Sequence, residues 1–246
     1  MAARGDLVMR RALSLAVLLG LLLAAPAAAQ EIAIDLGEGG SLTARTLQII
    51  ALITVLSLAP GLAIMITSFP FVVTVLSILR QAIGLQQSPP NMLIVSLALF
   101  LTYFVMSPVF EAAYEAGIGP LMDGQMETMD ALAQAYEPFR VFMMARVDPD
   151  TLQTMSSLRD GVPEAAPDPS VLIPSFMLSE VERAFQIGFL VFLPFLIIDL
   201  VVAAVLMSMG MVMVPPAIVS LPFKLAFFVV ADGWALVTGA LVRSYF

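Results

Sequence analysis

The chain has 246 residues, of which 60% are apolar, and its mean hydropathy of +0.99 is typical of membrane proteins. Its 19 acidic and 11 basic residues argue against nucleic acid as a partner, because no cationic surface is available to neutralise phosphates. The absence of cysteine and histidine excludes disulfides, thiolate nucleophiles, histidine-dependent triads and nearly all zinc chemistry.

Residues 1–29 have the features of a secretory signal peptide. Three arginines precede an apolar stretch over 13–25, and Ala27-Ala28-Ala29 forms a small-residue cleavage motif. A retained transmembrane helix is the alternative, but the apolar stretch is short for a membrane span. We therefore expect cleavage after residue 29, followed by a polar N-terminal tail over 30–46.

A first hydrophobic hairpin is predicted over 47–110. Its first apolar run, 47–65, contains Pro60-Gly61, so we expect a kink or a break there. A helical segment then covers 71–83 and ends in Arg80 and Gly84. The hairpin turns at Pro89–Pro90. Asn91 is a predicted N-cap for a second helix over 92–106, which Pro108 is expected to close.

An acidic helical lobe is predicted over 111–183. Residues 111–182 hold 13 acidic residues against three arginines, as expected of a non-cytoplasmic loop. One amphipathic helix is predicted over 122–137, with its apolar face at Met122, Met126, Met129, Ala133 and Tyr136. Residues 161–169 are a linker by composition, and Pro174 is expected to begin the next helix.

A second hydrophobic hairpin with a methionine-rich tip is predicted over 184–246. Four methionines, Met207, Met209, Met211 and Met213, lead into Pro215–Pro216, where the chain turns. In a helix these methionines would form two opposite pairs, whereas an extended chain would aim all four the same way. They are lipid-facing packing in one interpretation, and a compliant apolar seal around a pore in the other.

Four charged residues in or next to the apolar arms, Arg80, Asp199, Lys224 and Asp232, are candidate subunit-contact residues. Asp199 is an ionisable group inside a membrane-length segment. Counting from Pro215–Pro216 puts Asp199 and Asp232 at one level, about 25 Å from the turn, and Lys224 only about 13 Å from it. Lys224 is therefore not expected to face Asp199. Arg80 or another subunit would supply the cation, and Arg80 is alternatively an interfacial anchor.

These features predict an all-α, membrane-associated protein without catalytic residues, metal or cofactor. No phosphate-binding loop, dinucleotide fingerprint or nucleophile beside paired carboxylates is present in the sequence. If four apolar arms span the membrane, the lobe lies on the periplasmic side and both double-proline tips point toward the cytoplasm.

Four blocks of sequence resemble the FliP family of flagellar export proteins. They are TSFPFVVTVLSILRQAIGLQQSPPN (67–91), LALFLTYFVMSPV (97–109), the segment 174–216 that ends in LMSMGMVMVPP, and LPFKLAFFVVADGW (221–234). The resemblance covers most of the chain after residue 47. Injectisome proteins share these blocks, but the signal peptide favours the flagellar branch.

The resemblance implies a non-enzymatic, pore-forming subunit of the flagellar type III secretion export gate. It implies a homo-oligomer of about five copies that assembles with FliR- and FliQ-type subunits and other export-apparatus membrane proteins and passes unfolded secreted substrates. It places the protein in the bacterial inner membrane, in the flagellar basal body. It also implies that the hairpins pack on each other, largely at the periplasmic face. That arrangement conflicts with a topology in which each of the four apolar arms crosses the membrane. The family's methionine-rich gasket falls on Met211, Val212 and Met213, where valine replaces a central methionine.

Alternatives from other classes are an injectisome export-gate homologue, a secondary transporter and a membrane scaffold. A transporter would use broken helices and a buried acid near the membrane midplane, and Pro60-Gly61 and Asp199 are compatible with that pattern. Stoichiometry separates these classes, since a gate subunit purifies as a multi-copy complex.

Overall fold

The computed structural model describes residues 42–84, 89–159 and 167–246. The predicted signal peptide, 1–29, and most of the predicted tail, 30–41, lie outside these residues. The chain divides into two compact units, 1–53 and 54–246. Of the first unit, only residues 42–53, the start of one helix, are described.

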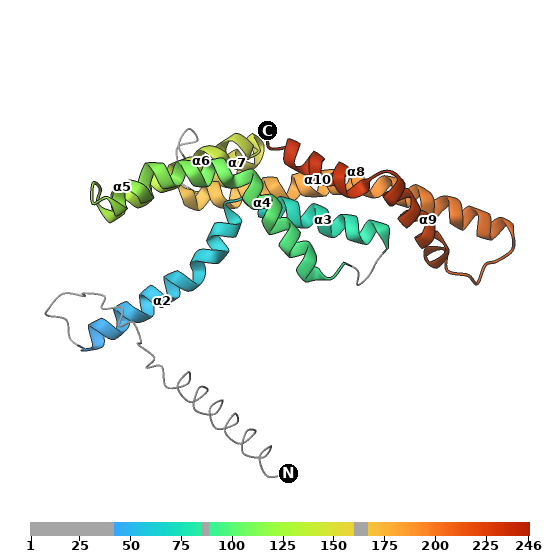
Figure 1. Ribbon diagram of the computed structural model, residues 1–246, viewed down its shortest axis with the longest axis horizontal. Helices are drawn as coiled ribbons and strands as arrows, with labels where there is room; N and C mark the ends of the chain where they lie inside the picture. Colours follow the sequence, from blue (N-terminus) through green and yellow to red (C-terminus); the bar gives the residue numbers. More distant parts are fainter. Residues whose placement is uncertain (1–41, 85–88, 160–166) are drawn as a thin grey trace, which may run out of the picture. The chain divides into compact units, whose positions relative to one another are not determined.

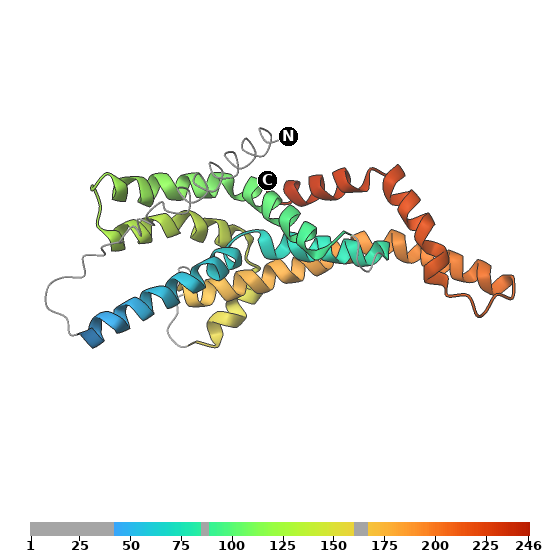
Figure 2. The same ribbon diagram turned by 60° about the horizontal axis from the view of Figure 1, so that its bottom comes forward.

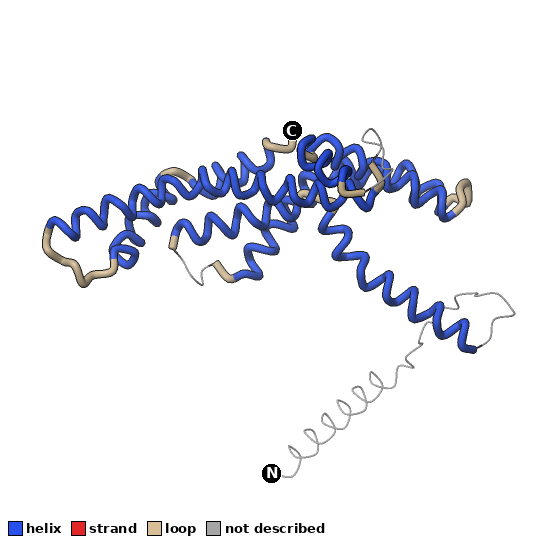
Figure 3. The backbone as a smooth tube through the Cα atoms, turned by 180° about the vertical axis from the view of Figure 1, so that it is seen from behind, coloured by secondary structure: helices blue, strands red, loops and turns tan. Residues whose placement is uncertain are grey.

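Every regular element in the described part of the chain is helical, which confirms the predicted all-α class (Figure 3). The helices are α2 (Leu42–Met65), α3 (Phe69–Ile83), α4 (Asn91–Ala113), a π-helical turn (Tyr114–Ile118), α5 (Gly119–Met122), α6 (Thr128–Arg146), α7 (Pro149–Ser157), α8 (Pro169–Ser208), α9 (Pro216–Val230) and α10 (Gly233–Arg243).

Helix α2 runs through Pro60 without ending, so of the two outcomes predicted at Pro60-Gly61 the break is wrong, and the kink stays a prediction. A proline inside a helix removes one backbone hydrogen bond, and this helix tolerates that loss. The helix ends instead at Met65, and α3 begins at Phe69 with Pro70 in its first turn, where a backbone N–H is not needed. The last five residues of the predicted tail, 42–46, are helical as well.

Helices α3 and α4 form the described part of the first hairpin. Helix α3 ends as predicted at Ile83, and Gly84 adopts a left-handed conformation with φ of 88°. Helix α4 does not close at Pro108. It continues to Ala113 and, through the π-helical turn, to Met122. The two helices share an apolar core with α8, α10 and the C-terminus that contains Phe71, Val75, Ala98 and Leu241.

The acidic lobe is built from α6 and α7, packed on the first part of α8. Its core contains Met143, Leu152, Val171 and Phe176. The predicted amphipathic helix over 122–137 is wrong, because a turn over 123–127 separates α5 from α6. Met129 and Ala133 on its predicted apolar face are exposed. Of α6, Ala131 in the first half and Met143 in the second half are buried, and of these two only Met143 belongs to the lobe core.

Helix α8 is the longest element and connects the lobe to the second hairpin. It starts at Pro169, five residues before the predicted start at Pro174, because the Asp168 side chain accepts a hydrogen bond from the backbone N–H of Ser170 and caps the helix. The predicted linker therefore ends by 168, and its residues 161–166 lie outside the description. At 40 residues α8 is about 60 Å long, roughly twice the hydrocarbon thickness of a bilayer.

Among the residues that the structure describes, two helical stretches are long and apolar enough to span a membrane, Asn91–Met122 and Pro169–Ser208. The count rises to four if each of two bent helix pairs forms one span. One such pair is Pro216–Val230 with Gly233–Arg243, bent by 62°. In Figures 1 and 2, α9 returns alongside α8, so these helices form the predicted second hairpin.

Candidate functional site at the tip of the second hairpin

Residues 209–215, which we call the tip loop, connect α8 to α9. The loop starts with a Schellman motif, in which the N–H of Met211 donates to Leu206 O at 2.9 Å and the N–H of Gly210 donates to Met207 O at 3.1 Å. Gly210 has a φ of 76°, a conformation that costs a residue with a Cβ about 1–2 kcal/mol. Pro215 then occupies the N-cap position and Pro216 is the first residue of α9. The tip loop therefore has a defined turn geometry.

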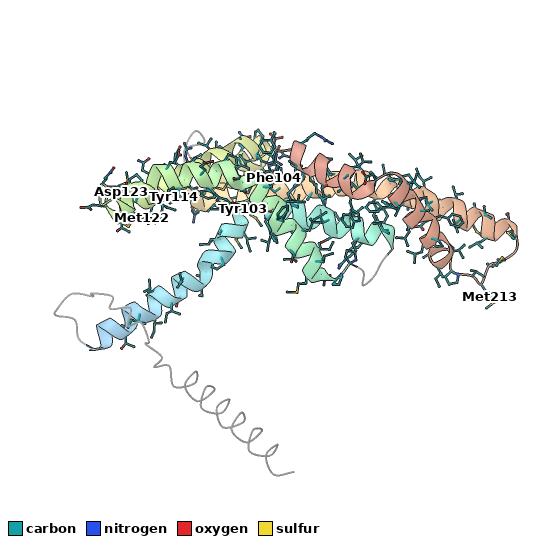
Figure 4. The ribbon with its side chains drawn as sticks, in the orientation of Figure 1. Tyr103, Phe104, Tyr114, Met122, Asp123 and Met213 are labelled. Carbon is teal, nitrogen blue, oxygen red and sulfur yellow. The ribbon has the colours of Figure 1, made fainter. Side chains whose placement is uncertain are left out.

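The side chains of the tip loop are apolar and exposed. Met213 is 97% exposed, Val212 81% and Met211 41%, and Met207 and Met209 are exposed as well. Figure 4 shows Met213 at the end of the loop, pointing away from both helices. Neither geometry considered for the four methionines is present, because α8 ends at Ser208 and the loop consists of turns rather than an extended chain. The loop presents an oily surface that the protomer itself does not cover.

An ion pair joins the two arms of the hairpin below the tip loop. Lys224 Nζ lies 2.6 Å from Asp199 Oδ2, and Ser220 Oγ donates to Asp199 Oδ1 at 2.5 Å. Lys224 Nζ also donates to Ala82 O at 3.0 Å, which connects the hairpin to α3. The Lys224 side chain is 7% exposed and that of Asp199 is 31% exposed. The pair is therefore desolvated mainly on the lysine side.

This ion pair corrects the prediction that Lys224 does not face Asp199. The prediction counted from Pro215–Pro216 as if both arms were helical up to that point. Because the tip loop is not helical, Asp199 is nine residues from the end of α8 and Lys224 is eight residues from the start of α9. Both lie about 12–13 Å from the loop. Asp232 is eight residues beyond Lys224, so its predicted level with Asp199 is also wrong.

Arg80 does not supply the cation for Asp199. Its Nη1 donates to Pro89 O at 3.4 Å and to Asn91 Oδ1, so it fastens the end of α3 to the start of α4. The Asn91 side chain accepts from Arg80 and makes no capping bond, and Pro90 occupies the N-cap position, so the predicted N-cap is wrong. Both double prolines, Pro89–Pro90 and Pro215–Pro216, directly precede or begin a helix.

Two cavities flank the ion pair. An apolar cavity of about 560 Å³ next to the tip loop is lined by residues of α8, α9 and the loop, among them Val205, Met211 and Phe223. A more polar cavity of about 480 Å³ is lined by Arg80, Phe192, Asp199, Lys224 and neighbouring residues, and lies where the hairpin meets α3. Among the described residues, no cluster of three or more acidic side chains could hold a metal ion.

A second charged cluster, which the sequence analysis missed, lies around Glu180. Its fully buried carboxylate accepts from Arg146 Nε at 2.8 Å, from Arg183 Nη1 at 3.2 Å and from Tyr245 Oη at 2.5 Å. The Arg146 guanidinium lies 3.7 Å from the centre of the Tyr245 ring. Burial, and next the charge of Glu180, raise the pKa of the Tyr245 hydroxyl above its ordinary value of 10. The cluster joins α6, α8 and the residues after α10.

The fold and the tip define a class: a helical membrane protein built on apolar hairpins, the second of which is held by an ion pair and ends in an exposed apolar loop. The model of the FliP family matches residues 52–241. The chain is 54% identical to the flagellar biosynthetic protein FliP of Caulobacter vibrioides, over 96% of this chain and 92% of that protein. It is 47% identical to that of Cereibacter sphaeroides, over 87% of this chain and 72% of the relative. With the protein of Bacillus subtilis the identity is 43%, over 81% of this chain and 92% of the relative.

The chain therefore belongs to the FliP family, as the sequence resemblance predicted. It is a membrane protein of the flagellar apparatus, with a role in flagellar biosynthesis, and it is not an enzyme.

Proposed function

We propose that this protein is the pore-forming subunit of the flagellar type III secretion export gate. Several copies, together with FliR- and FliQ-type subunits and other export-apparatus membrane proteins, bring their tip loops together in the inner membrane, largely at its periplasmic face. Unfolded flagellar proteins pass between the loops during flagellum assembly. The names of the relatives, all flagellar, favour this over an injectisome role.

The observation that carries the proposal is the tip loop itself. Its apolar side chains, Met211, Val212 and Met213, are exposed at the end of a hairpin whose arms are held by a charged pair. Exposed apolar surface of this kind marks a site that another surface covers. Methionine is flexible and polarisable, so it can close around chains of varied shape and reseal after they pass. Val212 makes the middle of the seal stiffer but keeps it apolar.

The charges of the hairpin have a supporting role in this proposal. Asp199 and Lys224 fix the two arms in register and connect them to α3. Arg80 fixes the first hairpin, and Asp232 occupies the bend between α9 and α10. In the assembled gate, we propose that these four residues hold the hairpins in the arrangement from which neighbouring copies pack.

The experiment replaces Met211, Val212 and Met213 together with alanine and measures ion leakage across the membrane of cells that carry the assembled complex. The expected result is increased ion permeability with the complex still assembled, because three smaller side chains per copy no longer fill the centre. The control is Met129→Ala, which truncates an exposed methionine of the lobe and should leave permeability unchanged. Unchanged permeability in the triple variant would contradict the seal.

The subunit role has its own test. The native mass of the purified complex gives the number of copies directly, and a multi-copy complex that contains smaller apolar subunits is the expected result. A monomer or a dimer without such subunits would refute the gate and favour the transporter alternative.

A further inference from the structure

Helix α10 is joined to α9 by a bend at one residue. The axes of the two helices differ by 62°, and only Ala231 and Asp232 separate them. Asp232 has φ of 49° and ψ of 48°, and it is the single non-glycine residue with positive φ in the described part of the chain. Its side chain is exposed and makes no capping hydrogen bond. A change in the angle between the helices can therefore be taken up at this one position.

The surface under α10 is incompletely packed. Within the helix, only Gly233 and Leu241 are buried. Two apolar cavities, of about 160 and 180 Å³, lie between α10 and the helices below it, and both are lined by Val191, Leu236 and Val237. Side chains that border a cavity lack contact partners on that side. Separating α10 from the helices under it therefore costs less dispersion energy than separating a fully packed helix of the same length.

The far end of α10 is held by polar contacts. Tyr245 Oη donates to Glu180 Oε2 at 2.5 Å, and Arg146 Nη1 donates to the carbonyl oxygen of Ser244 at 2.8 Å. In this closed arrangement Arg146 Nη2 is buried and has no hydrogen-bond partner. Water would reach that nitrogen once the chain end moves away, which lowers the cost of opening. The Tyr245 ring also packs against Phe71 and Phe142, with ring centres 5.5 and 6.0 Å away, and these contacts do not depend on its hydroxyl. The two hydrogen bonds are directional, so losing one of them weakens the attachment of residues 244–245 without removing it.

We propose that α10, together with residues 244–246, is a hinged strap that opens about Asp232 when the contact between Tyr245 and Glu180 is broken. Opening uncovers the apolar seam between α3 and α8, at Val75, Ile187 and Val191. The Glu180 cluster acts as the latch, and the bend at Asp232 acts as the hinge. This inference rests on the contacts of α10 alone and is independent of the proposed pore.

The test uses the absence of native cysteine, which makes a single introduced thiol the only reactive site. Val75→Cys places that thiol under the strap at a fully buried position, and Val171→Cys places one at a buried position in the lobe core. Each is combined with Tyr245→Phe in the purified full-length protein, and the rate of reaction with N-ethylmaleimide is measured. Tyr103→Phe, which removes an exposed hydroxyl from α4, is the matched control.

The strap predicts that Tyr245→Phe raises the labelling rate at position 75 by about tenfold, the factor expected for one lost hydrogen bond to a charged group. The rate at position 171 stays within about twofold, and Tyr103→Phe changes neither rate. No rise at position 75, or an equal rise at both positions, would overturn the proposal, because the first means that the latch does not hold α10 and the second means general unfolding. Hydrogen exchange gives a cysteine-free check, since the amides of α10 should exchange faster in Tyr245→Phe while those of α3 remain protected.

Discussion

Lys224→Met tests whether the pair with Asp199 holds the hairpin together. Methionine keeps the length of the stem but removes the charge, so the Asp199 carboxylate keeps only its bond from Ser220. Breaking a buried ion pair by removing one partner costs about 3–5 kcal/mol. Asp199 is close to one-third exposed, so water compensates part of this loss, and we expect about 2–3 kcal/mol. For a chain of this length that corresponds to a decrease in Tm of about 5–10 °C.

Trp234 is the only tryptophan, and it packs against Phe228 with ring centres 5.4 Å apart. Its fluorescence therefore reports thermal unfolding of the purified protein in detergent. The control is Arg243→Met, which removes an exposed cation and should change stability by less than about 0.5 kcal/mol.

A double-mutant cycle separates the ion pair from other effects of the substitution. Asp199→Leu combined with Lys224→Met removes both charges, so no uncompensated carboxylate remains, and Ser220 still donates to Ala217 O. We expect a coupling energy of about 2 kcal/mol, with the double variant more stable than the sum of the single variants implies. Additive single effects would refute the reasoning, because they would mean that the two side chains contribute independently.

Three further predictions concern the loop, the pair and the latch. Gly210→Ala should destabilise the protein by about 1 kcal/mol, because Gly210 has a positive φ. Gly61→Ala is the control and should stabilise it slightly, because Gly61 lies inside α2 and an added Cβ there meets no other atom. Equal shifts in Tm for the two variants would contradict this. Ser220→Ala should cost about 1–2 kcal/mol by removing one bond to Asp199, measured by the same unfolding assay, and no loss would show that this bond is dispensable. The pKa of Tyr245 is raised in the folded protein, so above pH 10 the unfolded chain loses the Tyr245 proton first and the free energy of unfolding falls. Tyr245→Phe should make this fall above pH 10 less steep in unfolding scans.

Local signals in the sequence were sufficient for several elements and misleading for others. Gly84 correctly marked the end of α3, because a left-handed residue terminates a helix whatever surrounds it. Pro60 predicts a kink or a break and Pro108 a helix end, yet both lie inside helices, since the rest of the helix compensates for one missing hydrogen bond. The turn that divides the predicted lobe helix was signalled by Asp123-Gly124, a common turn dipeptide that the methionine spacing obscured.

The charged contacts depended on geometry that sequence spacing does not contain. Sequence spacing does not predict the Asp199–Lys224 pair, because counting the seven loop residues as helix places Asp199 and the rest of the α8 arm too far from the turn, while the level of Lys224 is unaffected. The Glu180 cluster joins Arg146 and Tyr245, which are 34 and 65 residues away along the chain. No periodicity connects such positions. The exposed methionine-rich tip, in contrast, follows from composition and from the double proline at 215–216.

In the newly synthesised chain, helix α8 exposes apolar residues such as Phe189, Leu190 and Leu200, whose contact with water is unfavourable. Free copies in the aqueous phase would cluster through these faces, and through Phe100 and Phe104 of α4, before any flagellum could use them. Synthesis of the protein therefore has to be coupled to delivery into a bilayer, where these faces are no longer in contact with water.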